Sequence, residues 1–369
     1  MIRNLTRAGL LAASALAISA VPASANHTFA TTLSTTKLEP LTGGARYEAW
    51  AIKGERKLSG GFISAAAGGG ERRSVVNFPI NPRSADAIAI TIEPANDTDP
   101  GPSATVVLSG SVTSQGADLR FPVDLSGIAG SAILATPTDN DVNTNNDAAG
   151  LWFVDLSSGA PRPALKLPAL PAGWVWEGWG VTQGNPLTTG RFTDAARPDG
   201  FNGFSGTQGG PPLPGEDFVR NLPAAITGPV NLADGNSRAV LTIEPDQAGV
   251  DPTGAGPFFV RPLKHQIPAG QAIRTSFTLG RDISEVPSGS VSFGARISSS
   301  YKGWGVVSPD NGASAASAWR WSNASGWRAA IRPTGQQVYV YPYAQGWSWT
   351  WTASTGWLAM RTNALSSLG

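Results

Sequence analysis

Short runs in which apolar residues alternate with small or polar ones recur along the chain. Ile88, Ile90 and Ile92 are separated by Ala89 and Thr91, which is the two-residue period of a β-strand with one buried face. Residues 47–52 and 338–343 alternate in the same way. The pattern predicts an all-β protein of short strands joined by turns.

Composition supports this prediction. Charged residues make up 14% of the chain, against about 25% in typical globular domains. The 44 Gly and 29 Pro suit many turns and suit long helices poorly. The net charge of +1 provides no global field that would attract nucleic acid or an anionic membrane.

A segment near the N-terminus recurs later in the chain, and one constant offset aligns all its matching positions. Further along, the strand that ends in Glu93-Pro94 is echoed by one that ends in Glu244-Pro245. Two matches in the same order predict a duplicated module. The aligned pairs of the first match are Leu38 and Leu167, Leu41 and Leu170, Gly44 and Gly173, Tyr47 and Trp176, Glu48 and Glu177, Trp50 and Trp179, Ile52 and Val181, Leu58 and Leu187, and Gly61 and Gly190.

The repeated positions also predict local structure. Gly60-Gly61 and Thr189-Gly190 are expected to form tight turns or bulges. Glu93 and Glu244, each before a Pro that ends a strand, are expected to bind backbone amides at a turn. A paired-carboxylate site is the alternative for these two residues. Trp50 and Trp179 are expected in the cores of the modules.

The N-terminus has the features of a signal peptide. Arg3 and Arg7 precede the apolar stretch 8–20, and Ala23-Ser24-Ala25 fits the small-x-small cleavage rule. We therefore expect residues 1–25 to be removed and the chain to be exported to the periplasm, the cell surface or the exterior. The absence of cysteine excludes disulfides and thiolate chemistry and suggests a bacterial protein.

The repeated motif resembles a known family. A turn, then a Tyr-x-x-Trp-x-Ile strand, a Gly-Phe turn and a Thr-Ile-Glu-Pro strand are similar to the extracytoplasmic C-terminal domain of anti-sigma-K factors. The resemblance covers residues 37–110 and 130–263 and implies a β-sandwich. It carries over no catalytic residue. Sigma-factor binding is not implied, because a cleavable signal stands where those factors need a cytoplasmic domain and a membrane helix.

Four segments follow from these observations. We expect a signal peptide at residues 1–25, a first anti-sigma-K-like sandwich at 26–112 and a second at 113–268. A Trp-rich β region is expected at 269–369. The Gly/Pro-rich stretch 200–215 in the second module is expected to be an inserted surface loop.

The sequence has few of the residues that catalysis usually requires. The chain has two His, His27 and His265, and no Cys. A His-rich zinc site is therefore excluded, and no Gly-x-Ser-x-Gly motif supports a triad built on His265. We expect no catalytic residue and a protein that is not an enzyme.

One loop is rich in oxygen ligands, which suit Ca²⁺. It lacks Gly at the sixth place and Glu at the twelfth place of a calcium loop, and an Asx-rich turn is the alternative. Calcium is the one possible cofactor. The candidate ligands are Asp139, Asp141, Asn143, Asn145 and Asp147.

The C-terminal region holds the candidate binding residues. Residues 319–330 and 349–360 form a second repeat, and aromatic residues recur there with strand period. An exposed aromatic face stacks on sugar rings or associates with itself. The alternative is cross-strand pairs that hold small sheets together. The candidates are Trp319, Trp321, Trp327, Trp347, Trp349, Trp351, Trp357, Tyr341 and Tyr343.

Together these features predict a secreted or surface-associated, non-catalytic binding protein. Its partner is expected to be a glycan or a protein, contacted through the aromatic C-terminal region. A self-assembling structural surface protein is the first alternative. An extracytoplasmic sensor related to anti-sigma factors is the second. Nucleic acid is not expected as a partner, and no membrane span is expected.

Overall fold

The computed structural model describes residues 29–139, 146–247 and 256–293, together with the backbone of five strands between residues 303 and 361. Nearly all regular structure is antiparallel β, which confirms the predicted fold class. Within the described residues the helical structure is two three-residue 3-10 turns, η1 (Ala67–Gly69) and η2 (Pro82–Ser84). No helix there is long and apolar enough to cross a membrane.

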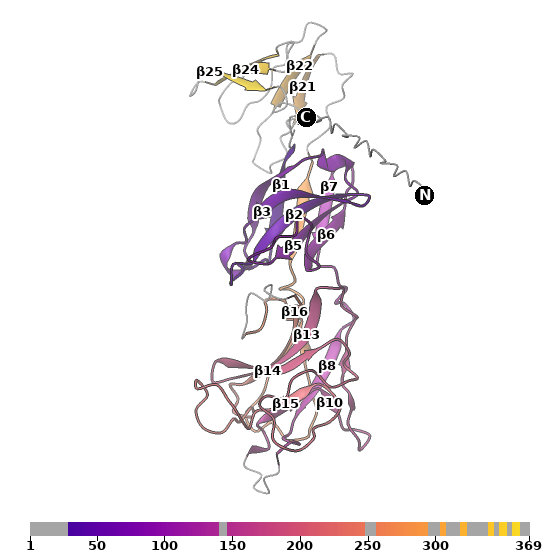
Figure 1. Ribbon diagram of the computed structural model, residues 1–369, viewed down its shortest axis with the longest axis vertical. Helices are drawn as coiled ribbons and strands as arrows, with labels where there is room; N and C mark the ends of the chain where they lie inside the picture. Colours follow the sequence, from indigo (N-terminus) through magenta and orange to yellow (C-terminus); the bar gives the residue numbers. More distant parts are fainter. Residues whose placement is uncertain are drawn as a thin grey trace, which may run out of the picture.

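The first assembly is one eight-stranded antiparallel sheet that curls on itself (Figure 1). Its edge strands β3 and β4 lie side by side. The ring of Phe78 on β4 stands 2.4 Å from where a Cβ on Gly60 of β3 would lie. The strands, in the order β3-β2-β5-β6-β7-β20-β1-β4, are β3 (Arg56–Ile63), β2 (Arg46–Lys53), β5 (Ala87–Glu93), β6 (Val106–Ser111), β7 (Gly116–Arg120), β20 (Ser288–Ser292), β1 (Phe29–Thr36) and β4 (Arg72–Phe78).

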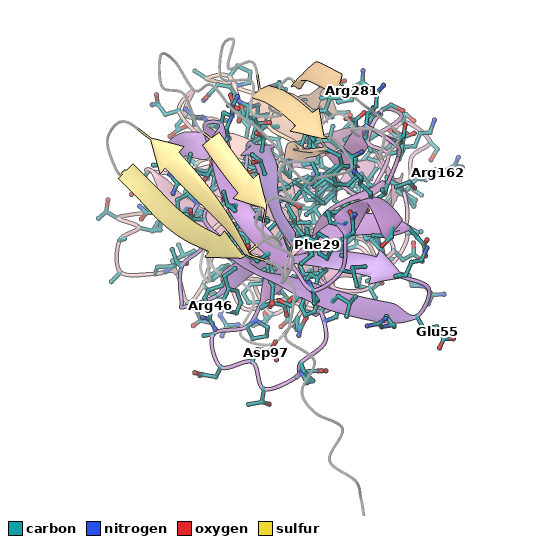
Figure 2. The ribbon with its side chains drawn as sticks, turned by 90° about the horizontal axis from the view of Figure 1, so that it is seen from above. Phe29, Arg46, Glu55, Asp97, Arg162 and Arg281 are labelled. Carbon is teal, nitrogen blue, oxygen red and sulfur yellow. The ribbon has the colours of Figure 1, made fainter. Side chains whose placement is uncertain are left out.

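The apolar period of β5 explains this core. Ile88, Ile90 and Ile92 are fully buried inside the curled sheet, as their alternation predicted. Tyr47 and Ala49 of β2 join the same core. The charged side chain of Glu55, in the turn between β2 and β3, points away from the ribbons when the molecule is viewed from above (Figure 2). The assembly is thus apolar inside and polar outside.

The second assembly has two sheets that pack face to face. The rings of Phe153 and Phe218, next to β9 and β15 of one sheet, fill the space in front of Gly178 and Gly180 on β13 of the other. The two-layer form predicted for this half is therefore present. One sheet contains β12 (Leu165–Lys166), β8 (Ala129–Leu134), β9 (Gly150–Trp152) and β15 (Gly215–Asp217), with β18 (Phe277–Thr278) also paired to β8; the other contains β14 (Asn185–Phe192), β13 (Trp174–Thr182), β16 (Arg238–Pro245), β17 (Leu263–Gln266) and β19 (Gly280–Arg281); a separate pair is β10 (Val154–Asp155) with β11 (Arg162–Pro163).

The segment after residue 268 returns to both assemblies. Strands β18 and β19 extend the second assembly, and β20 inserts between β1 and β7 of the first. Strand β7 also belongs to the first sheet, although residue 113 was the expected start of the second module. Strand pairing therefore does not follow the expected boundaries at residues 113 and 269.

A tryptophan joins the two assemblies. Trp174, at the start of β13, is 3% exposed and donates its indole N–H to the carbonyl of Val106 on β6, at 3.0 Å. Its ring packs edge-on against Phe121, with centroids 5.2 Å apart, and also contacts Phe258. In the alignment of the two repeats its counterpart in the first assembly is Ala45. The second repeat therefore has a tryptophan at the position that contacts the first assembly, where the first repeat has an alanine.

We predict that Trp174→Ala uncouples the two assemblies. The substitution removes a buried ring and its hydrogen bond, at a cost of about 3–5 kcal/mol. Thermal unfolding followed by calorimetry should then separate into two transitions. Tyr47→Phe, which removes one hydrogen bond within the first assembly, should lower stability without splitting the transition. A single transition at the wild-type midpoint for Trp174→Ala would refute the bridging role.

Candidate functional site

Two hairpins share one irregularity. In the hairpin of β2 and β3 the register shifts between Ala49 and Trp50, opposite Gly60. In the hairpin of β13 and β14 it shifts between Gly178 and Trp179, opposite Thr189. The bulges predicted at Gly60-Gly61 and Thr189-Gly190 are confirmed.

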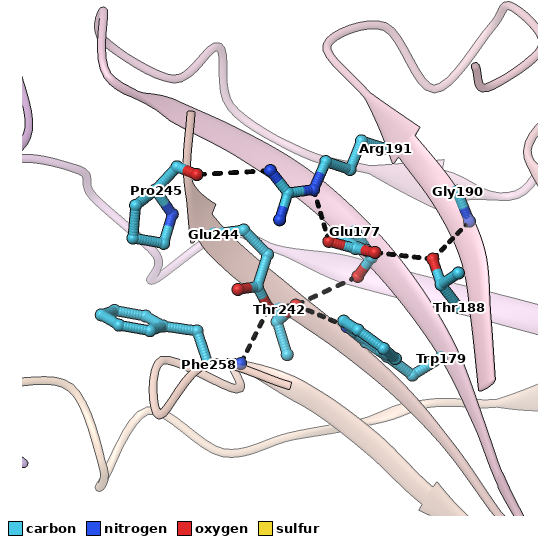
Figure 3. A network of polar contacts seen from close by, with 9 residues as sticks. All are labelled: Glu177, Trp179, Thr188, Gly190, Arg191, Thr242, Glu244, Pro245 and Phe258. Atoms are coloured by element: carbon cyan, nitrogen blue, oxygen red, sulfur yellow. Dashed lines mark hydrogen bonds and ion pairs between the residues drawn. The ribbon is translucent and has the colours of Figure 1, made fainter. Parts of the chain in front are cut away.

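A chain of polar contacts lies beneath the bulge in the second assembly (Figure 3). The indole of Trp179 donates to the hydroxyl of Thr242 at 2.9 Å, and that hydroxyl bonds the Glu244 carboxylate. The backbone N–H of Phe258 donates to the same carboxylate oxygen at 2.8 Å. Because Thr242 and Glu244 are fully buried, these contacts replace the water that both groups lose.

The first assembly contains the same set of contacts. Trp50 donates its indole N–H to the Thr91 hydroxyl at 2.8 Å, and the hydroxyl bonds Glu93. The backbone N–H of Ser103 reaches both Glu93 oxygens at 3.1 Å. Burial raises the pKa of Glu93, against the opposing effect of these hydrogen bonds. The expected role of Glu93 and Glu244 in binding backbone amides after a strand is confirmed, as is the burial of Trp50 and Trp179.

The halves differ beside these contacts. Glu177 binds Thr188 at 2.6 Å and forms an ion pair with Arg191 at 2.7 Å. At the position of Arg191 the first half has Phe62, whose half-exposed ring lies 4.0 Å beneath the guanidinium of Arg46. The two halves thus share the contacts of Trp, Thr and Glu, and they differ in the side chains beside these contacts.

Three carboxyl groups that the sequence analysis missed bracket the inserted segment 200–215. Asp217 accepts the backbone N–H of Thr138 and the indole N–H of Trp152, both at 2.7 Å. Glu216 accepts the backbone N–H of Phe204 at 2.9 Å. Asp199 accepts the N–H groups of residues 201 and 215 at 3.1 and 2.9 Å. The segment, expected to be an ordinary surface loop, is thus fastened through side chains, and its Leu213 is buried.

Burial dominates the ionisation of these groups. It raises the pKa of Glu216 to about 8 and that of Asp199 to about 6. The pKa of Asp217 is also raised, mainly by burial, against the opposing effect of its hydrogen bonds to Thr138 and Trp152. The sequence indicated these residues only by their position, because Asp199 precedes the Gly/Pro-rich insertion and Glu216 and Asp217 follow it.

The calcium candidates are only partly within the described residues. Asp139 accepts a hydrogen bond from the side chain of Asn146, and Asp147 accepts one from Thr136 at 3.5 Å. Asp141, Asn143 and Asn145 lie outside the described residues. In the described part of the chain, no group of three or more His, Asp or Glu could hold a metal ion. Calcium binding by the loop stays a prediction.

His265 packs against an aromatic ring. It stacks on Phe277, with centroids 4.9 Å apart and planes 23° apart. Its Nε2 is buried and has no hydrogen-bond partner, and burial lowers the pKa of the imidazole. These contacts provide no hydroxyl or carboxylate with which the imidazole could form a triad.

The aromatic candidates fall mainly on two small sheets near the C-terminus. One pairs β21 (Gly303–Val307) with β22 (Ala318–Ser322), where Trp319 is opposite Val306 and Trp321 is opposite Trp304. The other has β24 (Trp347–Thr352) between β23 (Tyr339–Pro342) and β25 (Gly356–Arg361). Trp327 and Tyr343 lie outside the described residues.

The register of the three-stranded sheet brings aromatic positions together. Trp351 is paired with Tyr339 on one side and Trp357 on the other, and Trp349 is paired with Tyr341. Paired positions share a face in an antiparallel sheet, as do positions two apart on one strand. We call this face the aromatic face. Its positions are Tyr339, Tyr341, Trp347, Trp349, Trp351 and Trp357.

Comparison with known proteins identifies one part of the chain. Residues 6–106 match the family model described as anti-sigma-K factor rskA, C-terminal. This range is about a quarter of the chain and ends at the start of β6. The predicted resemblance is confirmed there, so this part of the chain is similar to that domain, while the resemblance over residues 130–263 stays a prediction. No curated protein and no solved structure matches the chain.

We predict that Thr242→Val destabilises the second assembly by about 1–3 kcal/mol, the usual cost of leaving a buried donor, here the Trp179 indole, without its partner. The side chains are nearly isosteric, so the loss reports the hydroxyl alone. Thr91→Val should have a similar effect on the first assembly.

Urea denaturation of each variant measures the effect, with the exposed Thr278→Val as the control. Unchanged midpoints for both Thr242→Val and Thr91→Val would show that the repeated contacts contribute nothing.

Proposed function

We propose that this chain is an exported, non-catalytic binding protein that recognises a polysaccharide through its aromatic face. The observation that carries the proposal is the strand register, which gathers six aromatic positions on one face of a three-stranded sheet. Consecutive positions on one strand face lie about 6.8 Å apart. A row of large flat side chains at this spacing suits the faces of sugar rings in a chain.

Export is supported by the N-terminal sequence. Two Arg, an apolar stretch and a small-x-small site precede residue 26. The match of residues 6–106 to an extracytoplasmic domain of anti-sigma-K factors, which also takes in most of this leader, supports a protein that acts outside the cytoplasm.

We further propose that the two assemblies derive from one duplicated module. The support is a set of contacts that recurs at equivalent positions of the repeat, in which Trp50 and Trp179 each reach a Thr-x-Glu strand. Tyr47 and Trp176 likewise donate to equivalent carbonyls, those of Glu39 and Pro168. In this proposal the modules are a scaffold, and the C-terminal sheet makes the distinctive contact.

The family match favours one alternative function. A domain related to anti-sigma-K factors supports a sensor component whose partner is a protein. Self-assembly through the aromatic face is a further alternative from the sequence. The same set of variants can separate these functions from polysaccharide binding.

We predict that Trp349→Ala and Trp351→Ala each weaken binding to cell-envelope polysaccharide at least about tenfold, since a central aromatic contact contributes about 1–3 kcal/mol. Affinity electrophoresis through gels containing the polysaccharide measures the loss. Thr350→Ala is the matched control, because position 350 lies on the opposite face of the same strand.

Polysaccharide binding that is equal in all variants would refute the role of the aromatic face. Light scattering on the same samples reports self-association. A polymer that dissociates in Trp349→Ala, without any polysaccharide binding by the wild type, would favour self-assembly.

A further inference from the structure

The inserted segment of the second assembly is closed by the residue that precedes it. Asp199 binds the N–H of Phe201 with one oxygen and that of Gly215 with the other, so its carboxyl joins the two ends of the loop. Its carboxyl carbon stands 2.4 Å from where a Cβ on Gly190 would lie. Only a glycine at position 190 leaves room for this closure.

Two further carboxyls fasten the segment to the sheet beneath. Glu216 is fully buried, and one of its oxygens accepts the N–H of Phe204, while a hydrogen bond with the side chain of Ser205 opposes part of the effect of burial on its pKa. Asp217, also fully buried, holds Thr138 and Trp152. Asp199 and Glu216 therefore bind amides of the closed loop, while Asp217 binds groups on neighbouring segments of the sheet.

The charges around these acids are mainly of the same sign. Asp139 repels Asp217, Glu177 repels Asp199, and both Asp199 and Asp217 repel Glu216. The nearby cation, Arg191, forms its ion pair with Glu177. Ionisation of the three acids therefore places like charges close together in a buried site.

The closed loop covers an apolar patch on the sheet. The indole of Trp152 stands within 2.5 Å of the Cβ positions of both Gly210 and Gly215. Trp152 and Leu213 form a small apolar cluster with Ile133 and Val154. Lifting the loop would expose this cluster to solvent or to a partner.

We propose that residues 199–217 form a pH-operated latch, which is closed in acid and near-neutral solution and is released in alkaline solution to uncover the apolar cluster around Trp152. Burial costs little for protonated carboxyls, so they favour the closed form. Ionised carboxyls favour the open form, in which they are hydrated and lie farther from one another.

The direction of the effect follows from linkage. The pKa values of Glu216 and Asp199 in the closed form, about 8 and about 6, lie above their ordinary values. Each group therefore stabilises the closed form fully below its ordinary pKa. That stabilisation is lost as the pH rises through about 6 for Asp199 and about 8 for Glu216.

Hydrogen exchange of the full mature chain tests the latch. Protection factors, corrected for the intrinsic pH dependence of exchange, are measured between pH 5 and pH 9. Amides that bind the three carboxyls or Thr138 should lose at least about 100-fold in protection over this range, because each ionising carboxyl contributes up to about tenfold per pH unit. Within the loop those amides belong to Phe201, Phe204, Gly206 and Gly215.

The ladder of β13 and β16 provides the internal reference. Its protection should stay nearly constant while the loop opens. Loop protection that does not fall with pH would overturn the proposal. An equal fall in the loop and in the ladder would also overturn it, since that result indicates global unfolding.

Two variants assign the effect to particular groups. Glu216→Gln should remove most of the fall between pH 5 and pH 8, because the stabilisation by Glu216 is lost from its ordinary pKa up to about 8. Asp199→Asn should remove a smaller part of the fall, below about pH 6. Glu93→Gln, in the first assembly, should leave the loop profile unchanged. A wild-type profile in Glu216→Gln and Asp199→Asn would contradict the assignment, and the wild-type measurement decides the proposal even where a variant does not fold.

Discussion

The burial of backbone amides in loops is the constraint on which this structure depends. Loops that cross the face of a sheet carry N–H groups away from water, and each one needs an acceptor. This chain provides buried carboxylates for that purpose. Glu93 accepts the N–H of Ser103, Glu244 that of Phe258 and Glu216 that of Phe204. Without cysteine to hold the loops, these hydrogen bonds tie them to the sheets.

The same constraint links structure to ionisation. A carboxyl that binds amides in a buried site is stabilised by those bonds and destabilised by the loss of water. For Glu93, Glu216 and Asp199 the loss of water is the larger effect, and their pKa values are raised. The groups that hold the loops in place therefore also make the closure of those loops sensitive to pH.

Patterns that repeat over a few residues were predictable from the sequence. The period of Ile88, Ile90 and Ile92 predicted the strand and its apolar face, and Gly60-Gly61 predicted the bulge, because both depend on local geometry. The expectation that only one face of this strand is buried was wrong, since Thr91 and Glu93 on the other face are buried as well. The return of β20 to the first sheet was not predictable, since strand pairing between residues 29–36 and 288–292 leaves no local signal. The Trp174 bridge and the Asp199, Glu216 and Asp217 cluster likewise depend on contacts between distant segments.

The family match and the aromatic face lie in different parts of the chain. The match covers residues 6–106, and the aromatic face lies near the C-terminus. Trp174 holds the two assemblies together through Val106 and Phe121. The scaffold that results has an apolar core that runs through both assemblies, and several of its buried carboxyls bind loop amides and indoles.

The most direct test of this account is the ionisation of the buried carboxyls, measured by ¹³C NMR titration of the Asp and Glu side chains of the protein. The account predicts that Asp199 titrates near pH 6 and Glu216 near pH 8. The account would be contradicted if every carboxyl titrated at the ordinary values of about 3.9 for Asp and about 4.3 for Glu.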